Sequence, residues 1–352
     1  MTSVLPEMLT DKQGTQVTVR LAVYADRVQV ASTISDHTGT GSGTGNDDFL
    51  LQEFDRMVDD PEVMLLFVDD TQLQTGPEAS ADAAPNLAPD SARGLGMMAI
   101  VWSSDKESYW RSLRVAEAAR ERGIASILFR AAVRVVLDRQ GPMSVSRWGI
   151  VSDNTTMLEW SRRLSLHGPQ AFRRHGSTAC ATTPALPAAY EIRRAACEVD
   201  IRCIMESLPK TVATSVFGTQ NFVHAGWAEF SEVTLRACIA GAPHHGIPTP
   251  APRVLFDGTG EPLAFASLAI MRFGSMRVLV YWYVDGTPEG LELLINQMPA
   301  IAHEYGCDAT DGYVPALPWL LAIFERSPFY TRGTATEQLV FRWKNAKCAS
   351  KR

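Results

Sequence analysis

Residues 113–128 read LRVAEAARERGIASIL, and the pattern of this stretch decides the fold class. Its first three residues end a segment with the alternation of a β-strand, and a helical pattern begins at Gly123. The polar loop between them leaves consecutive backbone N–H groups unpaired at a helix N-terminus, where the helix dipole also favours negative charge. Such a loop is suited to bind a pyrophosphate group.

Small and basic residues in this loop support the anion site. Gly123 and Ala125 carry little or no side chain, so the backbone can approach a phosphate closely, and Arg120 and Arg122 add positive charge. The alternative is a strand–turn–helix unit whose glycine only eases the turn, since short motifs often match by chance. The position after two consecutive strand patterns and the Arg-x-x-Gly-x-Ala spacing favour the anion site.

Outward from the loop, residues 15–180 have the strand and helix patterns of an α/β (α+β) domain. Strands are predicted over residues 15–24, 63–68, 94–103, 108–115, 147–151 and 171–180, and helices over residues 48–58, 123–137 and 155–166. Residues 35–47 and 71–93 are rich in small and polar residues, which predicts two long loops.

Residues 189–345 repeat that order of elements without repeating the sequence. Strands are predicted over residues 190–195, 253–256, 263–273, 276–284, 309–314 and 337–343, and helices over residues 199–208, 229–240, 289–305 and 318–326. The repeated order predicts tandem copies of one fold, each a mixed, mostly antiparallel sheet flanked by helices. Residues 181–188 are interpreted as the linker between the two domains.

Composition excludes several classes of function. The chain has 352 residues and a formal net charge of −6 at pH 7, with 33 Lys and Arg against 39 Asp and Glu. A weakly acidic chain is a poor nucleic-acid binder, because phosphate neutralisation needs clustered cations. No apolar run is long enough to span a membrane and the N-terminus has no signal-peptide pattern, which predicts a cytoplasmic protein.

The pattern of cysteines and histidines predicts no metal site. None of the six cysteines forms a CxxC pair, no histidine pair has zinc-ligand spacing, and His244-His245 is interpreted as a surface pair in a Pro/Gly-rich loop. The cysteines are therefore interpreted as reduced thiols. The sequence leaves a monomer and a homodimer equally open.

The loop motif resembles the acetyl-CoA-binding loop of the GCN5-related N-acetyltransferase (GNAT) superfamily. The resemblance rests on Leu113-Arg114-Val115 followed by Arg120-x-x-Gly123-x-Ala125, and on Ser152-Asp153-Asn154 before a helix. It implies acetyl-CoA as co-substrate and an enzyme that transfers an acetyl group without a metal. The cofactor-binding residues that it implies are Leu113, Arg114, Val115, Arg120, Glu121, Arg122, Gly123, Ile124, Ala125, Ser126 and Asn154.

The resemblance also suggests catalytic roles. The backbone of Leu113 and Val115 would pair with the pantetheine arm as an added strand does, and the Val115 N–H would polarise the thioester carbonyl. Tyr109 occupies the strand position where several relatives carry a glutamate base; the alternative is an aromatic residue that only packs. Ser161 stands where the family often has the tyrosine that protonates the leaving thiolate.

The second half departs from the motif. After its fourth strand the chain reads Asp285-Gly-Thr-Pro-Glu-Gly290, whose carboxylates would repel a pyrophosphate. We therefore expect a degenerate GNAT-like domain over residues 189–345 that completes the acceptor pocket of the domain over residues 15–180. Asp153, Tyr283 and Tyr330 are the candidate substrate-binding residues.

The whole layout is similar to that of the tandem-domain histidine N-acetyltransferases. This likeness implies a small-molecule amine as acceptor, such as a free amino acid, histidine included. Two alternatives stay open: a peptide or protein N-acetyltransferase, and a non-catalytic acyl-CoA-binding regulatory protein.

Overall fold

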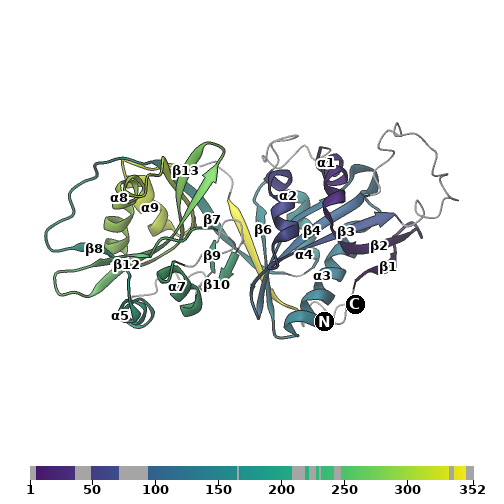
Figure 1. Cartoon of the computed structure of the whole chain (residues 1–352), viewed down its shortest axis with the longest axis horizontal. Helices are drawn as coiled ribbons and strands as arrows, with labels where there is room; N and C mark the ends of the chain where they lie inside the picture. Colours follow the sequence, from purple (N-terminus) through teal and green to yellow (C-terminus); the bar gives the residue numbers. More distant parts are fainter. Residues whose placement is uncertain are drawn as a thin grey trace. The chain divides into compact units, whose positions relative to one another are not determined.

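The structure is a computed structural model that describes residues 5–35, 49–70, 94–164, 166–207, 219–221, 227–229, 231–241, 247–332 and 337–345. The predicted loop over residues 71–93, nearly all of the one over residues 35–47, and His244-His245 lie outside these residues. The chain divides into two compact units. The first comprises Met1–Gly149, Asp153–His167 and Arg342–Arg352, and the second comprises Ile150–Ser152 and Gly168–Phe341 (Figure 1).

The first unit is built around a mixed sheet. Its elements are β1 (Glu7–Thr10), β2 (Gln16–Leu21), η1 (Tyr24–Asp26), α1 (Arg27–Ser35), α2 (Phe49–Asp59), β3 (Val63–Asp70), β4 (Gly94–Ser104), β5 (Glu107–Val115), η4 (Glu117–Ala119), α3 (Ile124–Gln140), β6 (Val145–Val151) and α4 (Thr155–Arg163). The strand order is β1-β2-β3-β4-β5-β6, with β16 (Gln338–Lys344) next to β6. All neighbours from β1 to β5 are antiparallel, whereas β5 and β6 are parallel.

Side-chain alternation on β3 and β4 gives this sheet two apolar faces. Leu65, Phe67 and Met97 form one buried core with Phe54 and Met57 of α2, because every second residue of a strand points to the same face. Helix α3 packs on β3, β4 and β5. Figure 1 shows α1 and α2 together, away from α3, so each helix layer covers its own face.

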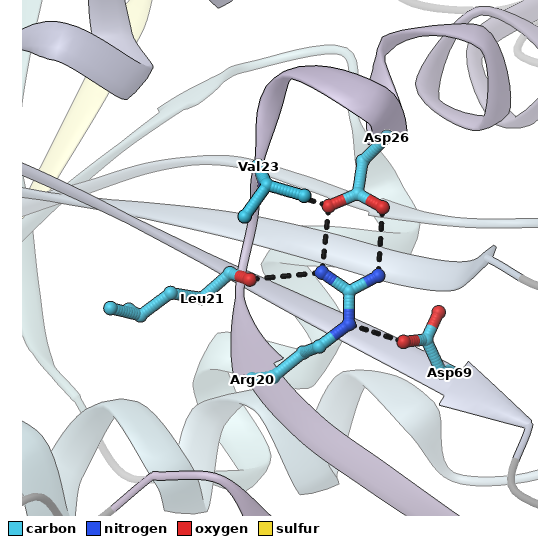
Figure 2. Close-up of polar contacts among 5 residues, drawn as sticks. All are labelled: Arg20, Leu21, Val23, Asp26 and Asp69. Atoms are coloured by element: carbon cyan, nitrogen blue, oxygen red, sulfur yellow. Dashed lines mark hydrogen bonds and ion pairs between the residues drawn. The ribbon is translucent and has the colours of Figure 1, made fainter.

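A buried ion-pair network fixes the start of α1 (Figure 2). The guanidinium of Arg20 on β2 donates from both Nη atoms to the Asp26 carboxylate at 2.7 Å, and its Nε donates to Asp69 of β3. The backbone N–H of Val23 donates to Asp26 Oδ2 at 2.8 Å. The network therefore attaches the turn η1, and the helix after it, to β2 and β3.

The second unit has the same plan. Its elements are β7 (His167–Thr178), β8 (Glu191–Arg194), α5 (Glu198–Arg202), a π-helical turn η5 (Cys203–Ser207), β9 (Thr219–Asn221), β10 (Trp227–Glu229), α7 (Glu232–Ile239), β11 (Arg253–Phe256), β12 (Pro262–Phe273), β13 (Met276–Gly286), α8 (Pro288–Glu304), β14 (Ala309–Pro315), α9 (Pro318–Arg326) and β15 (Thr331–Arg332). The strand order is β7-β14-β13-β12-β11-β8, with β13 and β14 parallel. Figure 1 shows α8 and α9 on one face of this sheet and α5 and α7 on the other.

The predicted fold class is confirmed: each unit has a mixed, mostly antiparallel sheet with helices on it. Most predicted elements are present with ends that differ by a few residues. The strand β1, the helix α1 and the β9–β10 hairpin were not predicted. The segment of α1, RVQVASTIS, mixes β-branched and polar residues and has no apolar stripe at helical spacing.

The two units differ from the predicted domains at the C-terminus. Residues from Arg342 on belong to the first unit rather than to the second. Trp343 packs edge-on against Trp110 of β5, with ring centroids 5.0 Å apart. The Asn345 amide nitrogen donates to Ser144 Oγ at 3.0 Å, and its amide oxygen accepts from Ser146 at 3.0 Å. The last strand therefore completes the core of the first unit.

Candidate functional site

The first unit has an opening between β5 and β6. The two parallel strands are paired from Glu107 and Val145 as far as Trp110 and Trp148. Beyond this point β5 continues to Val115 paired with β4 alone. The second half of β5 therefore presents one edge of backbone groups that no strand among the described residues occupies.

A β-bulge precedes this edge. Ser112 and Leu113 of β5 lie opposite the single residue Met98 of β4, and Ser112 has a φ of 58°. A bulge of this kind bends its strand and increases the local twist. The bend falls two residues after the last pair with β6, which accounts for the separation of the two strands.

The alternation of hydrogen-bonded pairs between β4 and β5 directs the Val115 N–H into the opening. The N–H of Ala116 donates to the carbonyl of Leu95 at 3.0 Å, so these two residues form a hydrogen-bonded pair. Residues along an antiparallel ladder alternate between hydrogen-bonded and non-bonded pairs. Val115, which lies opposite Gly96, is thus in a non-bonded pair, and its N–H and C=O point away from β4.

The loop after β5 exposes a series of amide groups at the N-terminus of α3. Within the described residues, the N–H groups of Glu121, Gly123, Ile124 and Ala125 form no hydrogen bond, whereas that of Ser126 donates to Gly123 at 3.0 Å. Glu121 and Gly123 have φ values of 68° and 84°, so the loop alternates between left-handed and ordinary conformations. Successive amides in such a loop form an anion-binding concavity, which fits a diphosphate.

The two loop arginines differ in their burial and in their ion-pair partners. Arg122 donates from Nε to Asp11 Oδ2 at 2.7 Å and from Nη2 to Asp70 at 3.3 Å, and only 12% of its side chain is exposed. Its guanidinium is therefore engaged by carboxylates, and its expected role in cofactor binding stays a prediction. Arg120 is exposed and pairs with Glu117 at 3.9 Å, so its ion pair is open to solvent, unlike that of Arg122.

The Asp11 carboxylate, which pairs with Arg122, is itself stabilised in its ionised form. Burial by itself would raise the pKa of this carboxyl, but hydrogen bonds from Arg122 and from the N–H groups of Thr15 and Gln13 outweigh it and lower the pKa below its ordinary value. Asp11 is therefore ionised throughout the neutral range. The charge that holds the loop in place does not titrate under physiological conditions.

The side chain of Lys12 lies next to Gly123. A β-carbon built at this position would lie 3.0 Å from Cγ of Lys12 and 3.3 Å from its Cδ and Cε. The stem of Lys12 thus fills the space beside the glycine that the sequence assigned to a phosphate. Gly123 is required for its left-handed conformation as N-cap of α3, and its missing side chain makes room for a lysine.

The segment after β6 contributes a helix cap. Asn154 accepts a hydrogen bond from the N–H of Met157 at 3.1 Å through its side-chain oxygen, and so caps α4. Its amide nitrogen remains for a ligand. Asp153, just before it, is exposed on the surface of the first unit.

Ser161 is fully buried on α4, and its hydroxyl donates to the carbonyl of Met157 at 2.8 Å. This is the usual hydrogen bond of a serine within a helix, to the residue four positions earlier. In this arrangement Ser161 has no free proton to give to a thiolate. The structure therefore gives no support for Ser161 as the general acid.

Tyr109 lies on the face of β5 that α2 covers. It is buried, with 7% of its surface exposed, and it is near Arg111, two residues later on the same face. The Nη2 of Arg111 lies 3.8 Å from Met57 Sδ of α2. Burial lowers the pKa of Arg111. This face thus carries a phenol and a cation, and the sequence reasoning missed the cation.

The corresponding place in the second unit is closed. Helix α8 begins directly after β13, its cap Thr287 accepts from the N–H of Gly290 at 3.0 Å, and the Thr287 N–H donates to Leu263 at 2.8 Å. A β-carbon on Gly290 would lie 2.8 Å from Leu263 Cβ. Asp285, 1% exposed, accepts from the Gly286 N–H at 2.8 Å. No room for a diphosphate remains among these residues.

The two candidate tyrosines of the second unit are both engaged. The Tyr283 hydroxyl donates to Asp285 Oδ2 at 2.8 Å, and 5% of the residue is exposed. The Tyr330 hydroxyl donates to the carbonyl of Ile295 at 3.1 Å, and its ring packs edge-on against Phe324 at 4.9 Å. Burial raises the pKa of both phenols. These contacts make Tyr283 a core residue and hold the side chain of Tyr330 by its hydroxyl and its ring.

Two residues of the β1–β2 turn at the site, Asp11 and Lys12, were also missed. A polar DKQGT turn before a strand is an ordinary hairpin signal, so the sequence offers no hint that the turn lies against a loop more than a hundred residues later. In the described part of the chain, no cluster of three or more His, Cys, Asp or Glu side chains could hold a metal ion. Over the same residues, no helix has the length and apolarity needed to cross a membrane.

Comparison with known proteins gives no match by sequence. No protein-family model matches the chain, and no curated protein matches it significantly. Among solved structures, a GCN5-related N-acetyltransferase from Sphaerobacter thermophilus is 11% identical with a TM-score of 0.58, and the match covers 94% of this chain and 96% of that one. A tandem GNAT protein from the clavulanic acid biosynthesis pathway is 11% identical with a TM-score of 0.55, covering 94% and 98%.

The chain has the tandem GNAT fold. Both units take part in this likeness, because the match with the tandem protein covers nearly all of both chains. A third similar structure is the glucosamine N-acetyltransferase region of a fungal multi-domain GH3 β-N-acetylglucosaminidase, 11% identical with a TM-score of 0.58, covering 94% of this chain and 38% of that one. In this GNAT-fold protein the separated strands are β5 and β6, and the loop that follows β5 is the one that the sequence motif singled out.

Proposed function

We propose that this protein is an N-acetyltransferase that uses acetyl-CoA and a small amine. The observation that carries the proposal is the direction of the Val115 N–H into the opening between β5 and β6, next to a loop of free amides at the start of α3. An acyl-CoA needs both features, because its phosphates are anionic and its extended arm pairs with a strand edge. The GNAT fold of the chain supports the same assignment.

The chain's own residues account for part of the chemistry. Acetyl-CoA supplies the activated thioester. The N–H groups of Glu121, Gly123, Ile124 and Ala125 would donate to its diphosphate, and the edge of β5 would hold its arm. The Val115 N–H would donate to the thioester carbonyl oxygen, where negative charge develops during attack by the amine. Tyr109 and Arg111 would face the acceptor from the side of α2.

The acceptor that we propose is a small amine, such as a free amino acid, and histidine is the first candidate to test. Arg111 supports an acceptor with a carboxylate, since an anion beside this half-buried guanidinium would offset the desolvation that lowers its pKa. The further expectation that residues 189–345 complete the acceptor pocket stays a prediction. Tyr283 is not retained as an acceptor contact because of its burial.

A second candidate is a non-catalytic acyl-CoA-binding protein. The hydroxyl of Ser161, at the position of the expected general acid, is committed to the carbonyl of Met157, and Glu121 places a carboxylate in the phosphate loop. The first feature would impair proton transfer to the leaving thiolate without affecting binding, whereas the Glu121 carboxylate would weaken binding of the phosphates. This candidate and the enzyme make different predictions in a single assay.

The test is a thiol-release assay with acetyl-CoA against free amino acids, histamine, polyamines, amino sugars and an N-terminal peptide. Turnover with small amines, and more with histidine than with histamine, supports the enzyme and the carboxylate preference. Acetyl-CoA binding without thiol release from any acceptor supports the non-catalytic candidate. Turnover with the peptide alone would overturn the small-acceptor proposal, and absence of acetyl-CoA binding in calorimetry would overturn both candidates.

A further inference from the structure

The turn between β1 and β2 places a lysine on the cofactor loop. The N–H of Lys12 donates to the carbonyl of Arg122 at 2.9 Å, and its stem lies beside Gly123 within 3.0–3.3 Å of the position of a β-carbon. We propose that the ammonium group of Lys12 binds the diphosphate of the acyl-CoA at the N-terminus of α3. The inference rests on the proposed function and adds a binding residue that lies outside the loop motif.

The backbone of Lys12 is fixed from both sides. Asp11 accepts from the N–H groups of Gln13 at 2.8 Å and Thr15 at 2.9 Å, and its other oxygen accepts from Arg122. The turn is thus attached to the loop by an ion pair and by a backbone hydrogen bond. A lysine held in this way loses little further backbone freedom when it binds an anion.

The ammonium group of Lys12 is free to take an anionic ligand. Lys12 is exposed, and the carboxylate nearest to it in the sequence, Asp11, is occupied by Arg122 and two amides. Across the residues that the structure describes, no ion pair engages the Lys12 ammonium. The side chain is therefore solvated at the edge of the proposed phosphate site.

The charges around the loop require such a cation. Arg122 is neutralised by Asp11 and Asp70, and Glu121 adds a negative charge to the loop. The other loop arginine, Arg120, pairs with the carboxylate of Glu117 at 3.9 Å. A diphosphate carries two negative charges. The dipole of α3 and Arg120 would attract it, whereas the carboxylate of Glu121 would repel it. Lys12 supplies the missing positive charge.

The test compares acetyl-CoA binding by the full-length wild type, Lys12→Met, Lys12→Arg and Lys106→Met in calorimetry. Methionine keeps the apolar stem beside Gly123 and removes the charge, and arginine restores the charge. Lys106 is an exposed lysine in the turn before β5, at the opposite end of that strand from the loop. Acetyl-dephospho-CoA, which lacks the 3′-phosphate, is titrated as a second ligand.

We expect Lys12→Met to raise the Kd about tenfold for both ligands, which is about 1.4 kcal/mol, because the variant loses a charge-assisted contact. Its binding should also depend less on salt, whereas Lys12→Arg and Lys106→Met should bind nearly as the wild type does. An unchanged Kd for Lys12→Met would overturn the inference while the proposed function stands. A loss confined to acetyl-CoA would assign Lys12 to the 3′-phosphate and overturn the diphosphate assignment. Failure of the wild type to bind either ligand would overturn the proposed function itself.

Discussion

Asp11 Oδ2 accepts a hydrogen bond from Arg122 Nε at 2.7 Å, across 111 residues of sequence. This ion pair attaches the β1–β2 turn to the loop that opens α3. The side chain of Asp11 is fully buried and that of Arg122 is 12% exposed, so water screens the pair weakly. The shape of the candidate cofactor loop therefore depends on the N-terminal hairpin as much as on the loop's own sequence.

Asp11→Asn should destabilise this attachment. Loss of the carboxylate leaves a largely buried guanidinium with one weaker partner, and we expect the free energy of unfolding to fall by about 2–3 kcal/mol. Acetyl-CoA binding should weaken as the loop loosens. Urea denaturation and calorimetry measure the two effects, with the exposed Asp105→Asn in the β4–β5 turn as control. A variant as stable as the wild type would contradict the anchoring role.

The same pair has a defined pH dependence. Because the pKa of Asp11 is lower in the folded protein than its ordinary value, its contribution to stability is complete above about pH 5 and is lost as the pH falls below about 4. The difference in stability between wild type and Asp11→Asn should therefore be constant from about pH 5 to 8 and shrink at lower pH. Denaturation series at several pH values test this. A difference that shrinks between pH 6 and 8 would contradict it.

Glu121 combines an unfavourable conformation with an unfavourable charge. Its φ of 68° is in the left-handed region, which costs a non-glycine residue about 1–2 kcal/mol. Glu121→Gly should raise the free energy of unfolding by roughly 0.5–1 kcal/mol, after the greater flexibility of glycine in the unfolded chain is subtracted. It should also lower the Kd for acetyl-CoA about two- to fivefold by removing a carboxylate from the phosphate site.

A second variant separates the two effects. Glu121→Gln keeps the strained backbone and removes the charge, so it should lower the Kd as the glycine variant does without raising the stability. Thermal melts and calorimetry on both variants provide the comparison. A Kd that stays unchanged in both would place the Glu121 side chain away from the ligand.

Local pattern was sufficient to predict much of the fold and the position of the loop. The helix over residues 123–137 and the strands on either side of the loop have strong periodicity, and the structure places α3, β5 and β6 there. Gly123 marks the start of the helix because no other residue type adopts its left-handed conformation as easily. The repeated order of elements correctly predicted a second unit with the same plan.

Contacts between distant segments could not be predicted in this way. Lys12 and Asp11 stand in a hairpin turn whose own sequence explains the turn completely, and their contact with Arg122 exists only in the folded chain. The packing of Trp343 on Trp110 is another such contact, and Trp343 belongs to the first unit, although its position in the sequence suggested the second. The pairing of Arg122 with Asp11 could not be predicted for a similar reason: a basic residue in a loop is equally consistent with a phosphate and with a buried carboxylate.

The Arg20 network in Figure 2 should be a major source of stability for the α1–α2 side of the first unit. Arg20→Ala leaves the buried Asp26 and Asp69 without their cation, and we expect a loss of about 2–3 kcal/mol, allowing for the partial exposure of Arg20. The exposed pair of Arg27 with Asp55 provides a matched control, because Arg27→Ala removes an ion pair from the same region at little cost. Equal effects of the two substitutions in urea denaturation would contradict the prediction.

The buried ring of Trp343 should contribute strongly to the stability of the first unit. Its ring packs edge-on against Trp110 of the strand that bears the candidate site, and 3% of its surface is exposed. Trp343→Ala should lower the free energy of unfolding by about 3–5 kcal/mol, the range for removing a large buried aromatic side chain. The exposed neighbour Lys344 offers the control, since Lys344→Ala alters the same strand without touching the core. Acetyl-CoA binding should weaken in Trp343→Ala, because Trp110 lies directly before the separated part of β5.

Chain truncation should have a similar effect. A fragment ending at Thr183 lacks Trp343 and Asn345, so it should be less stable than the intact chain even before any contribution of the second unit is counted. Adding residues 337–352 to that fragment as a separate peptide should restore part of the lost stability, as judged by thermal melts. No gain on addition of the peptide, together with a silent Trp343→Ala, would show that the last strand is dispensable to the first unit.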